Sequence, residues 1–149
     1  MSLNVLNGPG ADVEEPDWKL LIPVREDKRH GTLRAMAHTE WVRVTSELRE
    51  AGTLAAVNRH TIQRLVLAYV RYDVAAMMVM AEGAVVKSKT GVSMLSLWQV
   101  EMRQADGDAT TQEMELCLNP RRRAAAGKAQ RKVKRATAAD TYLKPVARG

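Results

Sequence analysis

The sequence contains no phenylalanine and only one cysteine, and aromatic residues make up 4% of it. So few large rings leave little material for a sandwich of β-sheets with an aromatic core. Eight methionines, with many alanines and valines, favour helices that pack closely. The single Cys117 excludes an intramolecular disulfide and is typical of a reducing compartment. At the apolar end of a helix, we expect its thiol to be buried and inert.

Long apolar runs are also lacking, and residues 1–16 are polar rather than basic and then apolar. We therefore expect no membrane span, no membrane partner and no secretion, and place the protein in a cytoplasm.

The residue patterns of common active sites are missing as well. His30, His38 and His60 share no metal-ligand spacing with one another or with Cys117, and no glycine-rich phosphate-binding loop is present. Acids such as Glu40 are typical of solvated helix faces. The sequence therefore predicts no catalytic residue, no metal and no cofactor, and we expect a protein that is not an enzyme.

Residues 1–120 carry no net positive charge, and the excess of basic residues lies at the end of the chain. Residues 121–149 hold ten basic residues and one acid, a net charge of +9, whereas residues 1–120 carry a net charge of −3. This asymmetry predicts contact with a polyanion, nucleic acid ahead of membrane, although a solvated terminus is the alternative. Tyr142 is the only aromatic residue there, so base stacking is not expected to dominate. The candidate DNA-binding residues are Arg121, Arg122, Arg123, Lys128, Arg131, Lys132, Lys134 and Arg135.

Helical periodicity dominates the rest of the chain and predicts an all-α fold. An N-terminal arm and loop (1–33) precedes a helical oligomerisation core (34–120), and a basic tail (121–149) follows. The first two helices, about 34–51 and 58–81, are expected to form an antiparallel hairpin, with Gly52 capping the first and Asn58 starting the second. The second helix is apolar over more than half its circumference, which indicates a central helix or a subunit interface.

Two short valine-containing runs within 84–92 indicate a small β-hairpin or an extended loop before a third long helix, about 94–118. Ser93 is the expected cap of this helix. Asp106, Gly107 and Asp108 predict a kink or break within it. Upstream, Trp18 is expected to pack onto the helical body.

Several of these residues also follow a family pattern. The pattern comprises Trp41, Glu47-Leu48, Gly52, Leu54, Leu65, Tyr69, Tyr72, Glu82-Gly83, Gly91, Leu116, Leu118 and Pro120 followed by arginines. In this order and spacing, residues 18–125 resemble the small terminase subunits of tailed double-stranded DNA phages, in the branch whose core closes with Leu-Gly-Leu-Thr-Pro. Cys117 stands where that motif has glycine, and Asn119 where it has threonine.

The resemblance implies a packaging-initiation protein in the cytoplasm of a bacterial host. Such a subunit forms a homo-oligomeric ring, binds double-stranded viral DNA, and recruits and regulates the large terminase subunit, which is the ATPase and nuclease. We expect Tyr69, Met77, Leu95 and Trp98 at the ring interface, and Arg25, Lys28 and Arg29 as a second DNA patch. The alternatives are a structural adaptor of the phage head and a small DNA-binding regulator, although no helix-turn-helix is evident.

Overall fold

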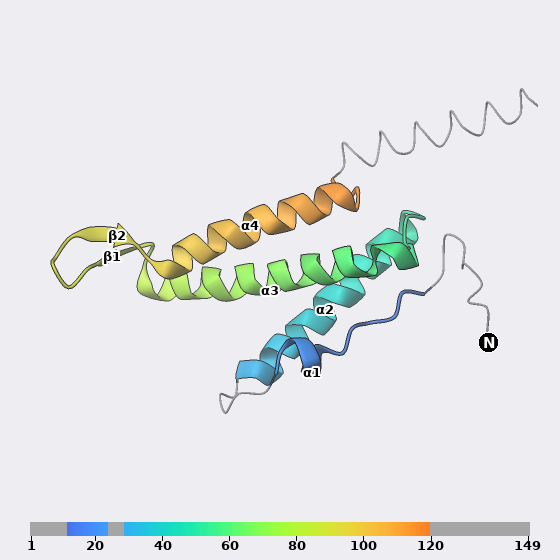
Figure 1. The fold of residues 1–149 in the computed structure, drawn as a ribbon, viewed down its shortest axis with the longest axis horizontal. Helices are drawn as coiled ribbons and strands as arrows, with labels where there is room; N and C mark the ends of the chain where they lie inside the picture. Colours follow the sequence, from blue (N-terminus) through green and yellow to red (C-terminus); the bar gives the residue numbers. More distant parts are fainter. Residues whose placement is uncertain (1–11, 24–28, 120–149) are drawn as a thin grey trace, which may run out of the picture. The chain divides into compact units, whose positions relative to one another are not determined.

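The computed structural model describes residues 12–23 and 29–119, which form helices and one small sheet (Figure 1). In chain order these elements are α1 (Trp18–Leu21), α2 (Arg29–Glu50), the 3-10 turn η1 (Ala56–Asn58), α3 (Arg59–Glu82), β1 (Val85–Lys87), β2 (Ser93–Leu95) and α4 (Leu97–Glu115). The helical fold with a β-hairpin before the last long helix is confirmed. Residues up to Leu116 belong to one compact unit, and Cys117–Asn119 are the described part of a second. None of the described helices combines the length and apolarity needed to cross a membrane.

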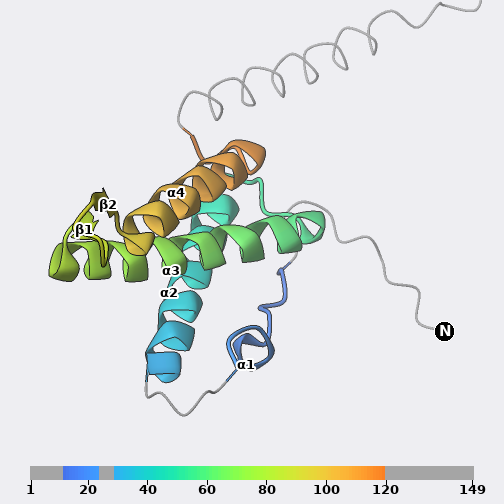
Figure 2. The ribbon, with the colours of Figure 1, turned by 60° about the vertical axis from the view of Figure 1, so that its left-hand side comes forward.

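Helices α3 and α4 form the most extensive packing in the first unit. They lie side by side and antiparallel, and the β-hairpin joins them at one end (Figures 1 and 2). Helix α2 crosses α3 obliquely instead of running along it, so its contact with α3 is shorter. The closest antiparallel pair is therefore formed by the second and third long helices.

Small side chains allow α3 and α4 to approach closely. Ala68 and Ala75 of α3 are buried, as are Ala105 and Ala109 of α4. The predicted kink at residues 106–108 is wrong, because α4 continues through them. These three residues are exposed between the two buried alanines, so packing on the opposite face holds the helix together despite Gly107.

The segment before α2 docks onto the helices. Trp18 is buried against Trp41 in an edge-to-face contact, with ring centroids 6.1 Å apart, as expected for a packing clip. The Arg34 guanidinium donates two hydrogen bonds to the carbonyl oxygen of Ile22, at 2.7 and 2.8 Å. The prediction of a loop up to residue 33 is wrong, since α2 begins at Arg29. Tertiary anchoring of this kind stabilises a first turn that its own sequence favours weakly.

The predicted end of α2 is confirmed. Gly52 has a φ of +68°, and the amide of Thr53 donates to the carbonyl of Leu48 at 2.9 Å, while the amide of Gly52 donates to that of Arg49 at 3.0 Å. This pair of bonds is the Schellman arrangement that glycine permits. Asn58 stands at the start of α3, but its side chain makes no capping bond, because η1 already gives it a helical backbone.

The start of the last helix also differs from its prediction. Ser93 lies in β2, and Ser96 caps α4 instead, with its hydroxyl accepting from the Gln99 amide at 3.0 Å. The strands pair antiparallel with Val85 opposite Leu95 and Val86 opposite Met94. The hairpin takes up residues that the helical periodicity had assigned to α4, so Leu95 lies on a strand.

Candidate functional site

The residues predicted to contact DNA fall outside the described side chains. Arg121 to Arg135, Arg25 and Lys28 lie outside the described residues, and Arg29 opens α2 with a side chain that is not described. The DNA-binding assignment therefore remains a prediction.

Most arginines of the described body are engaged in intramolecular bonds. Arg43 pairs with Glu40 and Glu47, at 2.6 and 2.9 Å, and Arg71 pairs with Glu101 and Asp108, at 2.7 and 3.0 Å. Two further arginines, Arg49 and Arg59, bond to Asp12 and to the Glu14 carbonyl, both at 2.9 Å. The side chains of Lys19, Lys87, Lys89 and Arg103 form no ion pair or hydrogen bond with the described parts of the chain.

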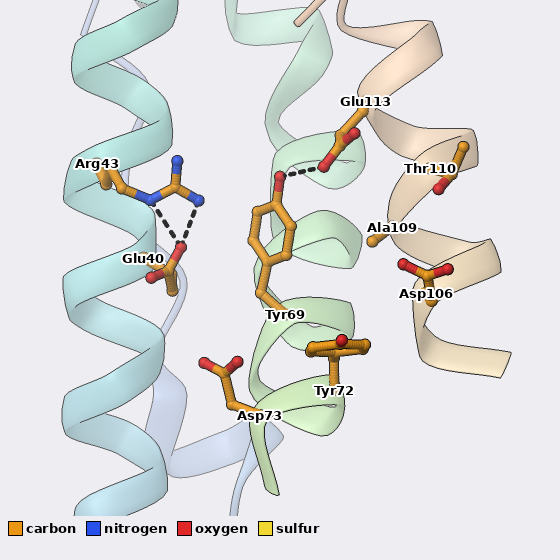
Figure 3. Close-up of a pocket in the computed structure, with 9 residues that line it drawn as sticks. All are labelled: Glu40, Arg43, Tyr69, Tyr72, Asp73, Asp106, Ala109, Thr110 and Glu113. Carbon is orange, nitrogen blue, oxygen red and sulfur yellow. Dashed lines mark hydrogen bonds and ion pairs between the residues drawn. The ribbon is translucent and has the colours of Figure 1, made fainter. Parts of the chain in front are cut away.

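A polar cleft of about 420 Å³ lies across three helices, and Figure 3 shows its lining. Helix α2 contributes Glu40 and Arg43, and α4 contributes Glu113 among others. From α3 between them, the Tyr69 hydroxyl donates to Glu113 Oε1 at 2.6 Å. The Arg43 guanidinium carbon lies 5.1 Å from the centre of the Tyr69 ring. Tyr69 thus connects all three helices through one ring. The remaining lining residues are Tyr72, Asp73, Asp106, Ala109 and Thr110.

The electrostatics of the cleft follow from partial burial and excess negative charge. Desolvation raises the pKa of Tyr69, and the hydrogen bond and charge of Glu113 raise it further, against the opposing effect of Arg43. Desolvation lowers the pKa of Arg43, but hydrogen bonds to Glu40, Tyr69 and Glu47 outweigh it, so the pKa stands above its ordinary value. Desolvation, and then the charge of Glu40, raise the pKa of Asp73, while Arg43 lowers it. At neutral pH the cleft is therefore anionic, with Tyr69 protonated and Arg43 charged.

This cleft resembles a structural network more than a reaction centre. Its lining holds no histidine, cysteine or serine. In residues 12–23 and 29–119, no group of three His, Cys, Asp or Glu side chains is arranged to hold a metal ion. The network could not be predicted from the sequence, because Glu113 lies 44 residues from Tyr69. Its only signal in the sequence was the Arg43–Glu47 spacing of one helical turn.

The second unusual surface is apolar and lies around the hairpin. We call it the open end: the last two turns of α3, the β-hairpin and the first turn of α4. It holds most of the large apolar side chains that the described residues expose, and these are Met77, Met80, Val85, Val92, Met94, Leu95, Leu97 and Val100. Monomeric proteins rarely leave such groups together in water, so this end is typical of an interaction site.

The predicted interface residues divide between the cleft and the open end. Met77 and Leu95 are exposed at the open end, and Trp98 is half-buried beside it. Tyr69 lies in the cleft, where its hydroxyl is bonded within the chain. The structure thus brings Met77, Leu95 and Trp98 to one end of the α3–α4 pair and places Tyr69 elsewhere.

The comparisons with known proteins address the same stretch of chain. Residues 37–133 match the family described as phage terminase, small subunit. The chain belongs to that family. The match spans about two thirds of the sequence, from the first turns of α2 to the middle of the basic segment. No curated protein and no solved structure matches the chain.

Membership gives the chain a role in phage DNA packaging. Small terminase subunits are generally regulatory and DNA-binding rather than catalytic.

Proposed function

We propose that this chain initiates phage genome packaging as a ring of identical subunits in the cytoplasm of the bacterial host. In this role it binds double-stranded viral DNA and recruits and regulates the large terminase subunit. The observation that carries the proposal is the family match, which covers both the helical body and the basic segment up to residue 133.

The open end supports self-association. Met77 exposes 58% of its surface and Leu97 exposes 83%, so much of their apolar area remains available to a partner. Burial of apolar area stabilises an assembly by about 25 cal/mol per Å² before the entropy lost on association is subtracted. We assign the ring interface to Met77, Leu95 and the accessible edge of Trp98.

The distribution of charge supports a DNA role for the tail. The arginines of the body are largely neutralised by neighbouring acids, whereas residues 121–149 carry a net charge of +9. Each basic residue that neutralises a phosphate releases a counterion, so the affinity is expected to fall steeply with salt. A ring repeats the tail once per subunit, and multivalency then strengthens weak contacts.

Two measurements on the full-length protein test this function. Light scattering gives the mass in solution, which we expect to be a multiple of 16.5 kDa. DNA binding across a salt series gives the number of phosphate contacts. A 16.5 kDa species without salt-sensitive DNA affinity would contradict the proposal.

A five-site variant separates the tail from the ring. Changing Lys128, Arg131, Lys132, Lys134 and Arg135 to glutamine is expected to lower the slope of log affinity against log salt by up to about 4, with the assembly mass unchanged. The matched control exchanges lysine and arginine at the same sites and preserves the charge. If the glutamine variant binds DNA normally but no longer captures purified large subunit, the tail serves that partner instead of DNA.

A further inference from the structure

A groove lies where α2 and α3 diverge, next to the open end. It has a volume of about 730 Å³ and an apolar lining made of Met36, Ala76, Met77, Met80 and Ala81, with Asp73 at its polar edge. Met80 exposes 87% of its surface there. The groove is open because α2 crosses α3 and then leaves it, so the last turns of α3 have no helix over this face (Figures 1 and 2).

The rim of the groove is acidic. Asp73 lines it, and Glu40 lines the adjoining hollow together with Asp73 and Met36. Burial raises the pKa of Asp73, repulsion from the charge of Glu40 raises it further, and Arg43 lowers it. A cation placed at this rim would relieve that repulsion.

The β-hairpin has the complementary character. Val85 and Val92 are exposed on it, and Lys87 and Lys89 make no ion pair with any described residue. Its turn is fixed by hydrogen bonds from the Ser88 amide to the Val92 carbonyl and from the Gly91 amide to the Ser88 carbonyl, both at 2.9 Å. The hairpin is therefore a short, pre-shaped projection with apolar side chains and two free positive charges.

The hairpin does not fill the groove of its own chain. No hairpin residue lines the groove, and the hairpin extends from the end of α3 as part of the α3–α4 connection (Figure 1). The same chain thus carries a concave surface with an acidic rim, the groove, and a convex basic surface, the hairpin. Two different complementary surfaces on the same chain make a head-to-tail contact, and such contacts close into rings when the rotation between copies allows it.

We propose that the β1–β2 hairpin of one copy inserts into the α2–α3 groove of the next copy. Val92, next to the turn of the hairpin, packs on Met77 and Met80, and Lys87 and Lys89 lie beside Asp73 and Glu40. This inference rests on the proposed ring, to which it adds the two surfaces that meet and the direction of the contact. Opposite charges fix the orientation of the insertion, and the apolar contacts supply its affinity.

A charge exchange between two variants tests the pairing. In the first variant, Lys87→Glu and Lys89→Glu make both hairpin and groove acidic; in the second, Asp73→Lys and Glu40→Gln make both basic. Each variant alone should fall to the 16.5 kDa species in light scattering, with circular dichroism unchanged. An equimolar mixture should recover assemblies that contain both variants, because each hairpin then meets a groove of opposite charge. The matched control, Lys19→Glu with Arg103→Glu, should assemble as the unchanged protein does.

The outcomes separate this inference from the function on which it rests. If the unchanged protein is 16.5 kDa at every concentration and salt, the ring itself is wrong. If the unchanged protein assembles and both variants assemble equally well alone, only the hairpin–groove contact is wrong. If the variants assemble but lose capture of purified large subunit, the groove serves that partner and the inference is overturned. Dissociation of both variants without recovery on mixing also contradicts direct pairing.

A cysteine pair gives an independent measurement. In a Cys117→Ser background, one variant carries Val92→Cys and another carries Met80→Cys. Mixed under mild oxidation, they should form a disulfide-linked dimer on a non-reducing gel, whereas Val92→Cys mixed with Val42→Cys should not. Equal crosslinking of both mixtures would overturn the proposed contact.

Discussion

The two ends of α3 have opposite environments although they belong to one continuous helix. In the half that starts at Arg59, Ile62, Leu65 and Val66 are fully buried beneath crossing helices. After Ala75 no residue of α3 is buried, and Met77 and Met80 face outward. We call the first region the packed end, in contrast to the open end.

This difference shows how the apolar content of a helix is divided between two purposes. At the packed end apolar side chains stabilise the single chain, whereas at the open end they remain available to a partner. The sequence showed that the apolar surface of α3 is wider than one neighbouring helix can cover. It did not show where the packed end stops and the open end starts, because that boundary depends on where α2 diverges from α3.

The largest expected effect compares truncations at the two ends. Leu65→Ala at the packed end should lower the free energy of unfolding by about 3 kcal/mol, because it leaves a cavity in a fully buried site. Met80→Ala at the open end should lower it by less than about 0.5 kcal/mol. Urea unfolding at low protein concentration measures both. Equal losses would mean that the open end is packed within the single chain.

The next effect concerns the connection between α3 and α4. Tyr69→Phe removes the hydrogen bond to Glu113 and should lower the unfolding free energy by about 1 kcal/mol, since it leaves a partly buried carboxylate without this donor. Tyr72→Phe is the matched control one turn along the same helix, and its more exposed side chain should make the change nearly neutral. Thermal unfolding followed by circular dichroism distinguishes the two. A larger loss for Tyr72→Phe would contradict the assigned network.

A smaller and stabilising effect is expected where α4 ends. Cys117 has a φ of +55°, a left-handed conformation that suits glycine. Cys117→Gly should raise the unfolding free energy by about 0.5–1 kcal/mol. Cys117→Ala keeps the strained backbone and should give no such gain. If alanine stabilises as much as glycine, the sulfur and not the backbone is responsible.

The smallest effect is the pH response of Asp73 at the groove beside α2. Its pKa is raised in the folded chain, so this residue favours folding below its unfolded pKa, and that contribution is lost as the pH rises through the folded pKa. Asp73→Asn should therefore raise stability at pH 7 by a few tenths of a kcal/mol, and the gain should vanish near pH 3. Urea titrations at the two pH values measure it. A gain of equal size at both would exclude the ionisation of Asp73 as its cause.

The sequence allowed the helices to be predicted where local signals were sufficient. The apolar spacing of Trp41, Val44 and Leu48 and the glycine at residue 52 located the end of α2 closely. The predicted boundaries were wrong where tertiary contacts determine whether a helix forms or continues. The start of α2 depends on the bond from Arg34 to Ile22, and the continuity of α4 through Gly107 depends on its packing against α3.

The candidate surfaces were predictable only in part. The apolar character of α3 pointed to an interface containing Met77, but nothing local showed that α2 diverges and leaves a groove beside it. The Tyr69–Glu113 bond joins residues too far apart in the sequence for any periodic pattern to reveal.

The bond between Arg34 and Ile22 has a further consequence for the segment that carries Trp18. That segment is attached to α2 at two points, through this bond and through the contact of Trp18 with Trp41. Once one contact has formed, the other closes only a short stretch of chain, and the entropic cost of closing a loop depends only weakly on its length. A single guanidinium on α2 thereby makes the docking of Trp18 cooperative.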